Sequence, residues 1–285
     1  AVFLTSTPDR VPHRHMWLWD SVFHSFAMSR VDREAAWSFL AAVLDRQRDD
    51  GMIPHMMPAH EPASAITQPP LLAWGVWEHY RAGGDRDRLE WALPRLEAYL
   101  GWNLEHRDRN RNGLLEWHIE GDARCRSGES GLDNSPRFDA AEPLDAVDFS
   151  TFQAQDMEHV ADIAAALGAR DRAMQWRQLA ERTRRMVFGS LWREGFYRDC
   201  DLAGQATPVK AVSGFLPLLL PGIPAEHVRA LLGQLADPRT FGAAFPVPSV
   251  SLDDPAFSTD MWRGATWANL NYAVIVGLRR QGCHA

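Results

Sequence analysis

The stretch that decides the fold is HMWLWDSVFHSFAMSR, residues 15–30. Its apolar side chains lie on almost every side of a helix, which predicts a helix that is buried on most sides. The next segment, about 33–48, carries its apolar residues on one stripe, and Asp32 is a suitable N-cap for it. A buried helix followed closely by an amphipathic one predicts a helical hairpin with an inner and an outer member.

The same pairing recurs along the chain. Further segments with helical periodicity lie at about 70–82, 86–105, 149–167, 170–188, 210–220, 225–236 and 264–281. Short and long connections alternate between these segments, so the long ones are expected to gather at one end of the helices. Between 188 and 210, Trp192, Phe196 and Tyr197 predict a short β-hairpin.

This layout predicts an all-α fold, an α/α-barrel with inner helices, outer helices and one face crowded with long loops. We expect one domain over residues 1–285. The alternative is an irregular α-solenoid, which would be used for interaction with other proteins. No internal sequence repeat supports that alternative.

Composition limits the class of protein. The 285 residues are 46% hydrophobic and carry a formal net charge of −7, without a basic run, so neither nucleic acid nor an anionic membrane is the expected partner. No run of about 18 apolar residues predicts a membrane-spanning helix. The three cysteines are far apart, and the N-terminal residues lack the pattern of a signal peptide, so a cytoplasmic location is expected. The oligomeric state stays open.

One loop stands out among the long connections: ESGLDNSP, residues 129–136, which has turn-forming residues and no period of its own. Alone, it can equally be an acidic surface turn. The loop face to which it belongs also collects carboxylates, amides and tryptophans, a combination that suits a sugar, because Trp stacks on a pyranose and carboxylates and amides bind its hydroxyl groups. The candidate substrate-binding residues are Trp17, Trp19, Asp20, His55, Gln68, Asn134, Arg137, Asp260, Trp262, Arg263 and Trp267.

Five motifs in order along the chain, WLWDSVFH (17–24), GMIPH (51–55), QPP (68–70), ESGLDNSP (129–136) and DMWRG (260–264), resemble glycoside hydrolase family 63. Within it they are most similar to the short bacterial enzymes that act on mannosylglycerate or glucosylglycerate, and the trehalase family is related. The resemblance implies an (α/α)6 barrel of the six-hairpin glycosidase type and hydrolysis of an α-glycoside with inversion.

The resemblance also implies roles for residues. Asp133 matches the general acid of the family, and the W-x-W-D and W-R-G motifs match its sugar-binding segments. The family's general base is a Glu in the loop before the last inner helix. This sequence stops at Ala285, straight after the ninth predicted helix. We therefore expect a barrel that is incomplete at both ends, lacks its last two helices and does not contain the base.

The leading hypothesis is an inverting hydrolase of a small α-glucoside or α-mannoside such as glucosylglycerate or mannosylglycerate. Arg137, Arg263 or His55 would pair with the carboxylate of the aglycone. The alternative is a sugar-binding protein that has lost hydrolysis. We expect no cofactor and no other macromolecular partner.

Weaker signals concern metals and thiols. The run DRNRNG (108–113) has the alternating oxygen ligands and the Gly of an EF-hand start, but position twelve is Ile119. A solvated Asn/Gly turn is the favoured interpretation and bound calcium the alternative. His13 and His15 lack a third ligand at fixed spacing, so no metal site is predicted. Cys200 stands between two aspartates, which predicts a raised thiol pKa and a poor nucleophile.

Overall fold

The computed structural model describes residues 3–9, 11 and 13–283. The longer helices in chain order are α1 (Leu18–Met28), α2 (Arg33–Leu44), α3 (Leu72–Gly83), α4 (Arg86–His106), α5 (Val147–Ala166), α6 (Arg170–Ser190), α7 (Ala225–Ala236) and α8 (Ala268–Arg280). The 3-10 segments are η1 (Gly128–Ser130), η2 (Pro136–Phe138), η3 (Val212–Leu219) and η4 (Met261–Arg263). Six two-residue strands are also present: β1 (Met16–Trp17), β2 (Met56–Met57), β3 (Leu144–Asp145), β4 (Trp192–Arg193), β5 (Phe196–Tyr197) and β6 (Cys200–Asp201).

Contacts divide the chain into two compact units. Unit 1 comprises Ala1–Arg107 and Phe152–Glu181, and unit 2 comprises Asp108–Thr151 and Arg182–Ala285. Two of the three boundaries fall within α5 and α6, and the third lies just after the end of α4. The single domain expected from the sequence stays a prediction.

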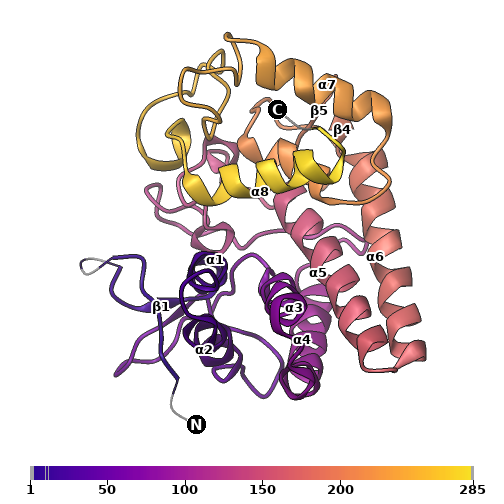
Figure 1. Cartoon of the computed structure of the whole chain (residues 1–285). Coiled ribbons are helices and arrows are strands. Elements are labelled where there is room, and N and C mark those ends of the chain that lie inside the picture. The colour runs from indigo at the N-terminus through magenta and orange to yellow at the C-terminus, as the bar shows by residue number, and fades with distance from the viewer. Residues whose placement is uncertain (1–2, 10, 12, 284–285) are drawn as a thin grey trace. The chain divides into compact units, whose positions relative to one another are not determined.

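In unit 1, α1 to α4 pack side by side (Figure 1). Gly75 on α3 permits the closest approach, because a Cβ there would lie 2.8 Å from a methyl group of Leu40 on α2 and 3.1 Å from one of Val22 on α1. Leu40 and Val22 are fully buried. The apolar helix predicted at 70–82 is therefore closely packed against both of its predecessors.

Side chains supply the backbone partners that these helices need at their ends. Asp32 accepts a hydrogen bond from the amide of Ala35 at the start of α2, as the sequence predicted. The first turn of α3 has no local cap, and the buried carboxylate of Asp156 on α5 accepts from the amides of Ala73 (2.8 Å) and Trp74 (3.0 Å) instead. A residue 83 positions away along the chain thus fixes where α3 begins.

In unit 2, α8 lies along η3. Gly277 makes this possible, since a Cβ there would lie 2.8 Å from the Cβ of Leu218. The adjacent core is aromatic: Phe196, Phe215 and Phe241 are fully buried, with ring centroids 4.8 to 5.5 Å apart. The hairpin predicted around Trp192 is confirmed by the antiparallel pairing of β4 and β5.

The structure corrects several predicted helix boundaries. Residues 15–17 belong to β1 and its approach, so α1 begins only at Leu18. The helix expected to reach residue 48 ends at Leu44. The segment predicted as helix 210–220 is 3-10 rather than α-helical, and Pro217 lies within it.

Two further observations concern the surface. Among the described residues, no helix is both long enough and apolar enough to cross a bilayer. Helix α8 exposes Tyr272 (40%) and Ile275 (47%), two large apolar side chains on a helix that the sequence predicted to be an inner one.

Candidate active site

The loop that carries Asp133 is buried almost throughout. Every residue from Ser127 to Phe138 is buried except Asp133, which is half-exposed. The backbone turns here through η1, then through Gly131 in the left-handed region (φ 70°), and then through η2. The loop therefore presents one carboxylate from an otherwise inaccessible segment. The interpretation of this stretch as an acidic surface turn is wrong.

Hydrogen bonds to the preceding segment hold this loop in place. The fully buried carboxylate of Glu129 accepts a hydrogen bond from the amide of His118 at 2.7 Å. The hydroxyl of Ser127 donates to the carbonyl of His118 at 2.9 Å. The carboxylate of Glu120 accepts from the amide of Gly128 at 2.9 Å. Glu129 thus has a structural role, because its carboxylate fixes the loop to the segment that contains His118.

Arg137 has a role different from the predicted one. Its guanidinium is buried, with 1% of the side chain exposed, and is paired with Asp148 and, at 2.9 Å, with Asp199. Burial alone would lower the pKa of Arg137, but these two carboxylates raise it. An aglycone carboxylate does not reach a guanidinium held in this way, so Arg137 anchors the loop and is not a substrate ligand.

Asn134 joins the loop to the second predicted sugar-binding segment, DMWRG. Its side-chain amide donates to Asp260 at 2.9 Å and accepts from the backbone amide of Trp262 at 2.9 Å. Trp262 is buried and stacks on Trp267 with ring centroids 4.1 Å apart. Two motifs that are 126 residues apart are therefore in direct contact, as predicted.

Arg263 also has partners within the protein. Both of its terminal nitrogens lie 2.8 Å from the carboxylate oxygens of Asp139, and one also donates to the carbonyl of Asn134. This bidentate pair ties the end of the loop to η4. The side chain of Arg263 is 24% exposed, so a ligand would have to share it with Asp139.

A second cluster of predicted residues lies in unit 1, at the start of α1. The side-chain oxygen of buried Gln68 accepts from the amide of Trp19 at 3.1 Å, and the carbonyl of His55 accepts from the amide of Leu18 at 3.0 Å. The rings of Trp17 and His55 meet edge to face at 5.1 Å. The helix start is thus capped by residues from two other motifs, and the prediction that these motifs lie together is confirmed for unit 1.

Asp20 and Trp17 are the members of this cluster best suited to meet a ligand. Burial raises the pKa of the Asp20 carboxyl from 3.8 to about 6, against the opposing effect of hydrogen bonds. The indole nitrogen of Trp17 is buried and has no hydrogen-bond partner among the described residues.

Sequence reasoning missed Asp139, Asp148 and Asp199, the acidic partners of the two arginines. In the run D-C-D at 199–201, the sequence led to a prediction only for the cysteine, and Asp199 was considered only as its neighbour. Burial does raise the pKa of Cys200, to about 11, and neighbouring aspartates add to the increase, so the predicted direction is confirmed. Nothing in the local sequence shows that Asp199 turns inward, since its partner lies 62 positions away.

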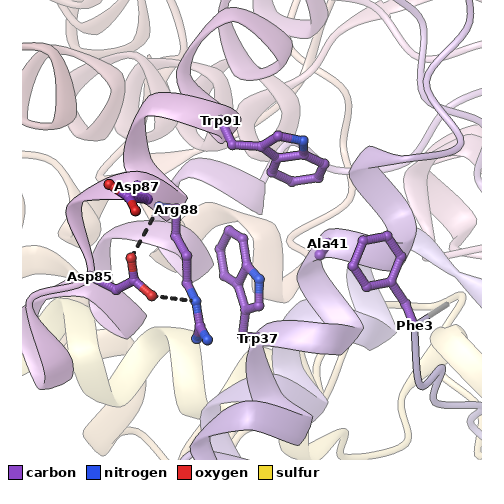
Figure 2. Close-up of a pocket in the computed structure, with 7 residues that line it drawn as sticks. All are labelled: Phe3, Trp37, Ala41, Asp85, Asp87, Arg88 and Trp91. Atoms are coloured by element: carbon purple, nitrogen blue, oxygen red, sulfur yellow. Dashed lines mark hydrogen bonds and ion pairs between the residues drawn. The ribbon is translucent and has the colours of Figure 1, made fainter. Parts of the chain in front are cut away.

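None of the predicted site residues lines the hollow shown in Figure 2. This hollow lies on α2 and α4, has a volume of about 310 Å³, and is flanked by the rings of Phe3, Trp37 and Trp91. Arg88 in its wall pairs with Asp85 at 2.7 Å and also covers the Trp37 ring. The candidate site residues are therefore assigned from the two motif clusters, each within its own unit, and not from this hollow.

Comparison with known proteins agrees with the motifs. The family described as "Mannosylglycerate hydrolase MGH1-like glycoside hydrolase domain" matches residues 13–285. Mannosylglycerate hydrolase of Thermus thermophilus is 30% identical, over 94% of this chain and 82% of the relative. Glucosylglycerate hydrolase of Mycolicibacterium hassiacum is 27% identical, over 98% of this chain and 82% of the relative.

The fold agrees as well. The crystal structure of a family 63 mannosylglycerate hydrolase of Thermus thermophilus in complex with Tris and D-glycerate superposes with a TM-score of 0.86 at 26% identity. The superposition covers 98% of this chain and 84% of that structure. The predicted all-α, (α/α)6-barrel class is thereby confirmed. The chain belongs to the mannosylglycerate hydrolase MGH1-like family of O-glycosyl hydrolases, within glycoside hydrolase family 63.

Proposed function

We propose that this protein hydrolyses the α-glycosidic bond of glucosylglycerate or mannosylglycerate with inversion, and that Asp133 is the general acid. The observation that carries the proposal is the presentation of Asp133 alone from the buried loop 127–138. A proton donor must be held in a fixed position beside the leaving oxygen, and a loop fastened by Glu129, Asn134 and Arg137 provides that rigidity.

Low polarity around a carboxyl group favours its protonated form, which a general acid requires. The surroundings of Asp133 are acidic as well as buried. Burial raises the pKa of the nearby Cys125 thiol to about 12, and the carboxylates of Asp133 and Glu120 contribute to that increase.

The remaining candidate residues divide into ligands and supports. We propose Trp17, Asp20 and His55 as the sugar ligands within unit 1, and Asp260 and Trp267 as those within unit 2. We propose that the other candidate residues mainly hold those ligands in position, because their polar groups already bond within the protein. These residues are Trp19, Gln68, Asn134, Trp262 and Arg263. We assign no residue of this chain as the base that activates water.

The experiment is a measurement of sugar release from glucosylglycerate, mannosylglycerate and trehalose by the full chain and by Asp133→Asn. Release from the first two, lost in the variant while saturable binding persists, supports the proposal. Asp122→Asn, which removes an exposed carboxylate near the same loop, is the matched control and should keep full activity. Saturable binding without release by the unaltered chain would instead support the sugar-binding alternative.

A further inference from the structure

The hollow on α2 and α4 is bounded by aromatic rings that stand at steep angles to one another (Figure 2). The ring centroids of Trp37 and Trp91 are 5.9 Å apart at an interplanar angle of 72°, and those of Phe3 and Trp91 are 6.4 Å apart at 54°. The guanidinium of Arg95 lies over the Trp91 ring, 4.1 Å from its centroid, and stabilises the position of that ring. The small side chain of Ala41 lies between Phe3 and Trp37.

The volume of the hollow suits a small ligand. Ligand pockets of proteins usually have volumes of about 300–1,000 Å³ and combine apolar walls with a few polar groups. The hollow has a volume of about 310 Å³, which is at the lower end of this range. It can therefore hold a single ring but not an extended chain.

The polar rim of the hollow offers an acceptor and no available cation. Nε of Arg88 pairs with Asp85 at 2.7 Å, Nη2 pairs with Glu34, and Nη1 lies 2.8 Å from Nε2 of His79. An anionic ligand would compete with two carboxylates for this guanidinium. The carboxylate of Asp87, in contrast, is exposed and has no partner among the described residues.

Two hydrogen-bond donors also belong to the walls. The indole nitrogens of Trp37 and Trp91 have no hydrogen-bond partner among the described residues, and both side chains are half-exposed. Figure 2 shows the nitrogen of Trp37 on the edge of the ring that faces Ala41. An indole N–H only donates and an ionised carboxylate only accepts, so these groups together suit a ligand that does both.

We propose that this hollow binds the ring of a neutral monosaccharide. The apolar C–H groups of a pyranose pack against aromatic rings, while its hydroxyl groups accept from the two indole nitrogens and donate to Asp87. A quaternary ammonium ion is another ligand of aromatic walls, but it has no lone pair with which to accept from an indole N–H. All lining residues belong to unit 1, and none of them is a motif residue, so the proposal does not depend on the proposed hydrolysis.

The experiment follows the indole N–H signals of the full chain by ¹H–¹⁵N NMR. The chain has twelve tryptophans, and the variants Trp37→Phe and Trp91→Phe assign the two signals of interest. We expect D-glucose or D-mannose to move both signals with one common Kd on the order of 1–10 mM, because a ligand with few non-hydrogen atoms binds weakly. The signal of Trp176, whose indole nitrogen donates to Glu97 at 2.9 Å, is the internal control and should not move.

Two variants test the location of the bound sugar. Ala41→Leu should remove the movement of both signals, because the larger side chain occupies the hollow. Asp87→Ala, which changes only an exposed side chain, should weaken binding by about fivefold or more. Glu90→Ala is the matched control, since this exposed acid on the same helix pairs with Arg86 at the surface and its removal should leave Kd unchanged.

Three results would overturn the proposal. The first is the absence of saturable movement of the two signals with either sugar. The second is movement with tetramethylammonium chloride but with neither sugar, which would indicate a pocket for organic cations. The third is unchanged movement in Ala41→Leu, which would place the sugar elsewhere. Sugar release is not measured, so a failure of the proposed hydrolysis would leave this test intact.

Discussion

The guanidinium of Arg137 and the carboxylate of Asp199 form an ion pair of 2.9 Å in the interior of unit 2, with at most 2% of either side chain exposed. Asp148 completes the network, and Asp199 also accepts from the amide of Val147 at the start of α5. The loop that presents Asp133 is therefore attached to a helix start and to the segment before β6 through one buried cation. The position of the loop is therefore determined by contacts with segments that are distant in sequence.

Replacement of Arg137 by Met should strongly destabilise the protein, by about 3–5 kcal/mol, because two buried carboxylates lose their counter-charge. Chemical denaturation monitored by Trp fluorescence measures the loss. Arg239→Met is the matched control, since Arg239 pairs with Asp237 at the surface at 2.8 Å and its removal should change stability little. Equal effects in the two variants would contradict the role assigned to Arg137.

Asn134→Ala should lower kcat/KM by about 10- to 100-fold with a loss of stability of about 1–2 kcal/mol, because the loop is detached from Asp260 and Trp262. Gln281→Ala is the control. Its side-chain amide also bonds to the backbone, donating to the carbonyls of Leu218 at 2.7 Å and Leu220 at 3.2 Å, in a segment that carries none of the candidate residues. We expect it to lose similar stability and little activity, as shown by steady-state kinetics beside thermal denaturation.

The acid role of Asp133 predicts a dependence on the leaving group. Asp133→Asn should lose at least about 100-fold of kcat on the natural glycoside, whose leaving oxygen needs a proton. It should lose much less on the corresponding α-glycosyl fluoride, because fluoride departs with little protonation. Both rates are measured by sugar release. Equal losses on the two substrates would show that Asp133 has another function.

Asp20 predicts a pH dependence of substrate binding. With a pKa raised by burial to about 6, the carboxylate is ionised at pH 7.5 and mostly protonated at pH 5. As an acceptor for sugar hydroxyl groups, it should make KM rise as the pH falls through 6. Asp20→Asn should raise KM at pH 7.5 and flatten this dependence, which initial rates between pH 5 and 8 will test. A variant that retains the dependence would exclude Asp20 as its source.

The raised pKa of Glu116 predicts a pH dependence of stability. Its pKa is raised by burial from 4.5 to about 7, so between these values the folded chain binds more protons than the unfolded chain. The contribution of Glu116 to the free energy of unfolding therefore falls as the pH rises from about 4.5 to 7 and is constant above that. Glu116→Gln should raise Tm at pH 8 by a few degrees and remove this part of the slope. A lower Tm in the variant would contradict the interpretation.

Much of the fold was predictable from local pattern. The apolar periodicity indicates the helical hairpins, and the cap at Asp32 and the hairpin at Trp192 follow from short-range chemistry. The 3-10 geometry at Val212–Leu219 was not predicted, because its apolar pattern looks helical and the restriction imposed by Pro217 was not weighed. Likewise, the start of α3 depends on Asp156 from another helix, which no local pattern reveals.

By itself, the sequence determined which residues are chemically able to act and in which order their motifs occur, since composition, spacing and periodicity are properties of the chain. Only the tertiary structure decided which of them face a ligand and which support the fold. Arg137 and Asp133 stand four positions apart in one motif, yet one is buried in a charge network and the other is half-exposed. The physical reason is that burial of a charge depends on partners distant in sequence. Asp148 and Asp199 satisfy Arg137, whereas Glu116 and Asp108 each retain a buried oxygen without a donor among the described residues.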